Sequence, residues 1–132
     1  MSDLPSVAKM PSVLVVEDDA TLQNALTQVL ARAGYSVATA SNGMAALQIQ
    51  QQNPADVIVC DIVMPEKDGI ETLMEMAKLK PKPRFIAISG GGRINASCYL
   101  KVASKLGADR VFSKPFTSGE LITALKELLP HA

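Results

Sequence analysis

Residues 12–19 read SVLVVEDD, a run of strand character that passes directly into three consecutive acids. The four side chains at 13–16 are aliphatic at successive positions, which is typical of a strand buried on both faces. Residues 56–61, DVIVCD, repeat this arrangement, with a predicted strand at 56–60 and Asp61 at its carboxyl end. The sequence therefore predicts two buried strands, each followed at its carboxyl end by acidic side chains, and the rest of the fold is predicted around this pair.

Further strands and helical patterns alternate through the rest of the chain. Short apolar runs at 36–39, 84–88 and 110–112 predict three more strands, and residues 43–52 predict a helix. Apolar residues at helical spacing predict four other helices, with these inward faces: Leu22, Leu26, Val29 and Leu30; Ile70, Leu73, Met74 and Ala77; Tyr99, Val102, Ala103 and Leu106; Leu121, Leu125, Leu128 and Leu129.

Capping and stop signals mark the ends of these helices. Gly34 and Gly107 follow two of the patterns, and glycine commonly ends a helix because it tolerates a left-handed backbone. Asn42 is a candidate cap for the helix at 43–52, and residues 117–120, TSGE, form a capping box before the last helix. The Pro-Lys-Pro stretch at 81–83 should stop the third helix.

The order of elements is five strand–helix units. Continuous aliphatic strands alternating with amphipathic helices predict an α/β fold whose parallel sheet is covered on both faces. Right-handed crossovers then give a flavodoxin-like, doubly wound (βα)5 three-layer sandwich with strand order 2-1-3-4-5.

Length and composition set bounds on the class of protein. The 132 residues suit one domain, which we expect at residues 11–130, with a lead-in at 1–10 and a tail at 131–132. Lys plus Arg equals Asp plus Glu at 13 each, so the total charge gives no case for nucleic acid or an anionic membrane. No apolar run approaches the roughly 20 residues that span a bilayer. Cys60 and Cys98 lack metal or redox spacing, which favours reduced thiols in a cytoplasmic protein.

Polar side chains follow four of the predicted strands. The acids at 17–19 follow the first strand, Asp61 the third, Ser89 the fourth and Lys114 the fifth. Ligands of such sheets bind at the carboxyl ends of the strands, near the switch between the first and third. Converging carboxylates suit Mg²⁺, and acids in the first turn would repel the pyrophosphate of a dinucleotide. A carboxylate beside a cation and a lysine is also suited to attack phosphorus.

Four separated motifs resemble the receiver domain of two-component response regulators. They are LVVEDD at 14–19, DIVMPEKDG at 61–69, Ser89, and SKPF at 113–116, and the resemblance covers residues 11–130. It implies that Asp61 is the phosphoacceptor and that Mg²⁺ is bound by Asp18, Asp61 and the backbone carbonyl of Val63, with Glu17 acting through water.

The resemblance also assigns roles outside the metal ligands. Lys114 pairs with the acids and then with the phosphoryl group, Ser89 hydrogen-bonds that group, and the Lys114–Pro115 bond is cis. The phosphoryl donor would be a sensor histidine kinase or a histidine phosphotransfer protein. The output would be binding of a downstream protein, through a face at roughly 95–129, in two-component signalling or a phosphorelay.

The sequence departs from the family pattern at its switch. Many receivers carry Tyr or Phe three residues before the lysine, and Val111 occupies that position here. An aromatic rotamer switch is therefore unavailable, and we expect the glycine-rich segment at 90–93 to report phosphorylation together with Ser89.

Three alternative functions stay open at this stage. A phosphohydrolase would need an acid two residues after Asp61, and Val63 argues against it. We therefore expect no enzyme activity beyond self-catalysed phosphorylation and dephosphorylation. A degenerate receiver that binds partners without phosphorylation and a fragment of a larger regulator are the other two.

Overall fold

The computed structural model describes residues 10–62, 69–89 and 96–129, the last range without the side chains of 96–100. Strands and helices alternate from one end to the other. Their bounds are β1 Ser12–Val16, α1 Ala20–Arg32, β2 Ser36–Ala40, α2 Gly43–Gln52, β3 Val57–Asp61, α3 Gly69–Met76, β4 Arg84–Ser89, α4 Ala96–Lys105, β5 Arg110–Ser113 and α5 Ser118–Leu128.

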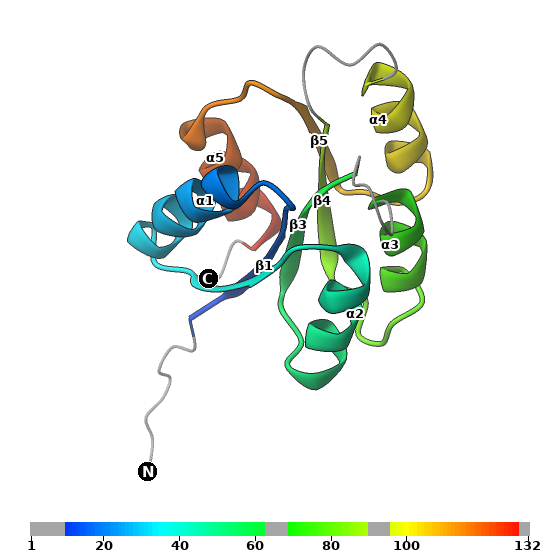
Figure 1. Ribbon diagram of the computed structural model, residues 1–132, viewed down its shortest axis with the longest axis horizontal. Helices are drawn as coiled ribbons and strands as arrows, with labels where there is room; N and C mark the ends of the chain where they lie inside the picture. Colours follow the sequence, from blue (N-terminus) through cyan, green and yellow to red (C-terminus); the bar gives the residue numbers. More distant parts are fainter. Residues whose placement is uncertain (1–9, 63–68, 90–95, 130–132) are drawn as a thin grey trace.

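The described strands form one parallel sheet in the order β2-β1-β3-β4-β5. Helices α1 and α5 cover one face of this sheet, and α2, α3 and α4 cover the other (Figure 1). This is the flavodoxin-like three-layer sandwich that the sequence predicts. None of the described helices is long and apolar enough to cross a membrane.

Two hydrophobic clusters fill the spaces between the layers. Successive side chains of a strand point to opposite faces, so each buried strand supplies both clusters. In β1, Val13 and Val15 pack with the α1 and α5 residues, whereas Leu14 and Val16 pack with those of α2, α3 and α4. Strands β1, β3 and β4, which are buried along almost their whole length, are central, while the more exposed β2 and β5 form the edges.

The predicted caps at Asn42 and Thr117 and the two glycine stops are confirmed, but α3 ends at Met76, before the Pro-Lys-Pro stretch that was expected to stop it. The side chains of Asn42 and Thr117 accept hydrogen bonds from Ala45 N and Glu120 N, at 2.8 and 3.0 Å. Gly34 and Gly107 have φ of 100° and 114°, the left-handed backbone expected after a helix. Asp19 caps α1 by accepting from Thr21 N and Leu22 N, so this acid serves the helix end.

Two of the predicted inward faces are partly wrong. Met74 is 47% exposed, and α3 buries Gly69, Thr72, Leu73 and Met76 in its place. In α4, Ala103 is buried, but Val102 and Leu106 are 44% and 38% exposed. Apolar spacing shows which residues share a face of a helix, whereas the packing angle on the sheet decides which of them are covered.

A close approach at the start of α3 fixes the end of β3. A Cβ on Gly69 would lie 2.2 Å from the Cα of Ile62 and 2.7 Å from the carbonyl oxygen of Asp61. Both atoms belong to the backbone and cannot move away as a side chain would. Gly69 N also donates to Ile62 O at 3.2 Å. Only glycine fits at this position, and it holds α3 against the strand that carries Asp61.

We predict that Gly69→Ala lowers the free energy of unfolding by roughly 1–3 kcal/mol, because the added methyl group forces the backbone of β3 to shift. Gly119→Ala is the matched control, since Gly119 also lies in a first helical turn and its added Cβ would meet nothing nearer than 3.8 Å. That control should be neutral or stabilising by up to about 1 kcal/mol. Urea unfolding measures both, and equal effects would contradict the close approach.

Candidate functional site

The predicted site residues converge at the carboxyl edge of the sheet. The parallel register places Val16 beside Cys60, Asp61 beside Ile88 and Ser89 beside Ser113. The residues that end these strands, or follow them directly, therefore meet although they are far apart in the sequence. Glu17 follows β1, Asp61 ends β3, Ser89 ends β4 and Lys114 follows β5.

Three carboxylates form an acidic cluster at this edge. Glu17, Asp18 and Asp61 each offer an oxygen, and the three oxygens lie within 4.8 Å of one another. Glu17 and Asp61 are only 2% and 6% exposed, whereas Asp18 lies open to solvent. Oxygen ligands at this spacing, with one side open for water, suit a hard divalent cation such as Mg²⁺.

Lys114 bridges the two buried acids. Its Nζ lies 3.3 Å from Glu17 Oε1 and 3.3 Å from Asp61 Oδ2. Its backbone N–H donates to Ser89 O at 2.8 Å, which anchors the segment after β5 to the end of β4. The Lys114–Pro115 peptide bond is cis, as expected. A single ammonium group is thus shared by two carboxylates that would otherwise repel each other.

Burial perturbs the titration of Glu17. The pKa of its carboxyl is raised from 4.5 to about 7, chiefly because burial removes the group from water. The charge of Asp61 also raises this pKa, while the N–H of Asp19, which donates to Glu17 Oε2 at 3.2 Å, and the Lys114 ammonium lower it. Ionised Glu17 is therefore under-compensated by the protein alone, and a divalent cation at the acidic cluster would favour its charged form.

Ser89 carries a buried polar atom that no described residue satisfies. Its side chain is fully buried, and its Oγ has no hydrogen-bond partner among the described residues. Buried hydroxyl groups are nearly always hydrogen-bonded, so such an atom beside a charged site marks a place for a ligand. The sequence prediction placed Ser89 here, but its unsatisfied hydroxyl is visible only in the structure.

Gln23 is a site residue that the sequence did not predict. Its Nε2 donates to the carbonyl oxygens of Glu17 and Ala40, at 3.0 and 3.2 Å, and so ties α1 to the ends of β1 and β2. Glu17 N donates in turn to Ala40 O at 3.0 Å. A glutamine in an amphipathic helix has no distinguishing sequence signal, because its role depends on two distant carbonyl groups.

Two parts of the predicted site and switch lie outside the described residues. They are Val63, expected to offer a carbonyl ligand, and the segment at 90–93, so both roles stay predictions. Val111 lies in β5 with 37% of its surface exposed, and its place in the switch is likewise still a prediction.

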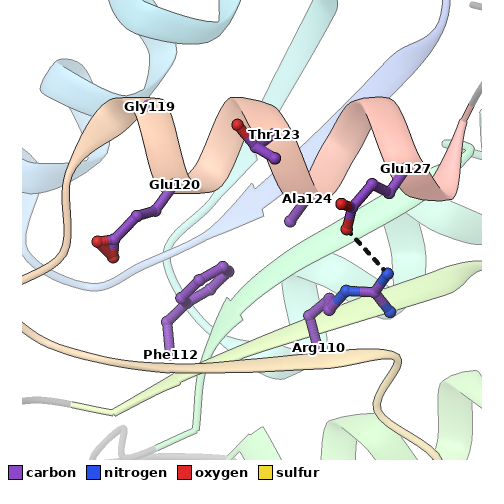
Figure 2. A pocket seen from close by; sticks show the side chains of 7 residues that line it. All are labelled: Arg110, Phe112, Gly119, Glu120, Thr123, Ala124 and Glu127. Carbon is purple, nitrogen blue, oxygen red and sulfur yellow. Dashed lines mark hydrogen bonds and ion pairs between the residues drawn. The ribbon is translucent and has the colours of Figure 1, made fainter.

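A groove of about 520 Å³ between β5 and α5 is separate from the acidic cluster. Figure 2 shows Phe112 and Arg110 of β5 facing Glu120, Ala124 and Glu127 of α5 across it. An ion pair of 3.1 Å between Arg110 and Glu127 crosses the groove at one end. None of its lining residues belongs to the candidate site.

Comparison with known proteins agrees with this fold and identifies the family. A family model described as the response regulator receiver domain matches residues 13–126. The chain belongs to the response regulator receiver domain family.

Individual relatives differ in length. The chain is 36% identical to a transcriptional regulatory protein CpxR homolog of Haemophilus influenzae over 91% of this chain and 51% of that protein. It is 32% identical to the chemotaxis protein CheY of Thermotoga maritima, over 88% of this chain and 95% of that protein. A crystal structure of a putative response regulator from Chloroflexus aurantiacus has a TM-score of 0.84 and 30% identity, and covers 93% of this chain and 100% of its own. The chain thus spans about half, or less, of the first curated relatives it matches, and nearly all of others.

The raised pKa of Glu17 predicts a pH dependence of stability in metal-free buffer. Below pH 4.5 the carboxyl is protonated in both states, and between about pH 4.5 and 7 only the unfolded chain releases the proton, so stability falls as pH rises. Above about pH 7 Glu17 is ionised in both states, and the full cost of burying its charge lowers the free energy of unfolding. Glu17→Gln should therefore raise the free energy of unfolding by roughly 1–3 kcal/mol at pH 8, and by much less at pH 5.

Thermal unfolding in EDTA at pH 5, 6 and 8 measures this difference. Adding Mg²⁺ at pH 8 should stabilise the unsubstituted protein more than Glu17→Gln, because the charged carboxyl is then compensated. Parallel pH profiles for the two proteins would contradict the assigned cause.

Proposed function

We propose that this protein accepts a phosphoryl group on Asp61 in a reaction that depends on Mg²⁺, and that this modification switches its binding to other proteins. One observation carries the proposal. The Asp61 carboxylate is held 3.3 Å from the Lys114 ammonium within a cluster of three acids. A nucleophile, a cation for the phosphoryl oxygens and a set of metal ligands are thus within reach of one another.

Asp61 is suited to be the nucleophile by its position. It is the last residue of a central strand, and it is 6% exposed. Its backbone and that of Ile62 lie directly against Gly69, which fixes their position. Its carboxylate oxygen would attack the phosphorus atom of a phosphohistidine, forming a P–O bond as the P–N bond to the imidazole breaks. The imidazole of the donor leaves with the electron pair of that bond, and the product is an aspartyl phosphate.

Lys114 has a different partner before and after this step. Before phosphorylation, its ammonium neutralises part of the charge of Glu17 and Asp61. Once Asp61 is modified, the nearest excess of negative charge is on the phosphoryl oxygens, and the ammonium can turn to them without leaving the site. The Ser89 hydroxyl, which has no partner among the described residues, can donate to another of these oxygens, which would satisfy the buried atom.

Metal binding falls to the acidic cluster. Glu17, Asp18 and Asp61 are the described residues that would hold Mg²⁺, directly or through water. When bound, Mg²⁺ supplies charge neutralisation for the phosphoryl oxygens in the transition state.

The biological partners follow from this chemistry. The phosphoryl donor would be a sensor histidine kinase or a histidine phosphotransfer protein, and the reader a downstream protein that distinguishes the two states. The protein would catalyse only its own phosphorylation and dephosphorylation. The family supports the proposed phosphoryl donor, and the acidic cluster supports self-catalysed phosphorylation as the only reaction that we propose.

Intact-protein mass spectrometry after incubation with acetyl phosphate and Mg²⁺ tests the proposal. We expect a mass gain of one phosphoryl group, which disappears with Asp61→Asn and in EDTA. Asp56→Asn is the matched control, because Asp56 is the other acid at β3 and lies exposed at its opposite end, where its Oδ2 accepts from Ser12 N at 2.8 Å. That variant should be phosphorylated normally. A gain that survives Asp61→Asn would contradict the assignment of the acceptor.

A further inference from the structure

Five exposed lysines gather at the carboxyl ends of α3 and α4, the end of the sheet opposite the acidic cluster. Lys78, Lys80 and Lys82 follow α3, and Lys101 and Lys105 lie in the last two turns of α4. The two helices lie side by side on one face of the sheet (Figure 1). The Nζ of Lys82 lies 3.5 Å from the place that a Cβ on Gly107 would take, so the segment after α3 reaches the turn after α4. We call these five residues the lysine patch.

The charge of the lysine patch is not neutralised within the described residues. No ion pair joins any of the five lysines to a carboxylate there. Nearby acids are already engaged, since Asp109 pairs with Arg84 at 3.6 Å, and Glu71 and Glu75 of α3 also have interaction partners. A chain whose formal net charge is zero therefore carries a local surplus of positive charge at this end.

Exposed aliphatic side chains accompany these lysines. Met74, 47% exposed, lies one helical turn before Lys78. Val102 and Leu106, 44% and 38% exposed, each follow a lysine of α4, at 101 and 105. Residues four apart lie on the same side of a helix, so α4 presents a basic row beside an apolar row. The surface is thus basic and apolar together, and it includes both predicted inward positions of α4 that the fold leaves uncovered.

The kinds of side chain favour carboxylates over phosphates as the ligand. Arginine is the residue best suited to phosphate, and Arg84, the arginine beside this patch among the described residues, is already paired with Asp109. None of the strongly exposed large hydrophobic side chains in the described ranges is aromatic. Stacking on single-stranded nucleic acid relies on aromatic side chains.

We propose that the lysine patch docks an acidic amphipathic segment of a partner protein. Carboxylates of that segment pair with the lysines, and its apolar side chains cover Met74, Val102 and Leu106. Because the patch lies at the end of the sheet opposite Asp61, docking does not require the aspartyl phosphate. This site holds a partner in both phosphorylation states, and it stands whether or not Asp61 is phosphorylated.

Fluorescence anisotropy with a labelled synthetic helix tests this docking site. The probe carries glutamates along one face and leucines along the other. We expect K82Q/K105Q to weaken its binding about fivefold to tenfold at low ionic strength, with a smaller loss at high salt. Leu106→Ser should weaken binding as well. R32Q/K126Q is the matched control, because it removes the same charge from exposed residues of α1 and α5 and should leave binding unchanged.

Thermal melts and phosphorylation of Asp61 should be the same for all these variants, which separates lost docking from lost folding. The proposal is overturned if the acidic helix does not bind at low salt, or if the control pair weakens it equally. Tighter binding of a single-stranded oligonucleotide or of phosphatidylglycerol vesicles than of the acidic helix would also overturn it, in favour of a phosphate ligand.

Discussion

The sharing of one ammonium group by two buried carboxylates is the interaction on which the site depends. Glu17 and Asp61 come from adjacent strands, and Lys114 reaches both at 3.3 Å from the far edge of the sheet. This geometry requires that β5 pairs with β4 and that the N–H of Lys114 donates a hydrogen bond to Ser89 O. It also requires the hydrogen bonds of Gln23, which join α1 to the ends of β1 and β2. The three-layer fold acts as a frame that holds like charges closer together than they would stay in water.

Burying charged and polar groups at this edge costs folding free energy, and the hydrophobic packing of the remaining structure offsets this cost. A hydrophobic cluster on each side of the sheet stabilises the fold. The buried Glu17 carboxyl with its raised pKa and the Ser89 hydroxyl, which no described residue satisfies, are unfavourable contributions at one edge of the sheet. A site in this state is poised to gain from a cation and from phosphoryl oxygens, since both satisfy groups that the protein leaves uncompensated. At the other end of the sheet the surplus charge is positive and exposed, so the two ends suit ligands of opposite kinds.

Much of this could be predicted from the sequence because the signals were local. Largely aliphatic strands, caps such as Asn42 and Thr117, and stops such as Gly34 define the elements. The handedness of the crossovers then places Glu17, Asp61, Ser89 and Lys114 at one edge of the sheet. The errors at Met74, Val102 and Leu106 have one cause, because periodicity does not specify how a helix is rotated on the sheet. Neither the role of Gln23 nor the close approach at Gly69 was predictable from the sequence. Both are contacts with backbone atoms that come near only when the chain folds. Val63 and residues 90–93 lie outside the described ranges, so those predictions stand as they were made.

The central claim is that the acidic cluster, Lys114 and Ser89 together bind a phosphoryl group on Asp61. A crystal structure with Mg²⁺ and beryllium fluoride, which mimics a phosphoryl group on a carboxylate, tests it most directly. We predict that the mimic lies on the Asp61 carboxylate, with Lys114 Nζ and Ser89 Oγ within hydrogen-bond distance of its fluorines, and that the cation is held by Glu17, Asp18 and Asp61. A mimic bound elsewhere, or Lys114 still held between Glu17 and Asp61 when the mimic is present, would contradict it.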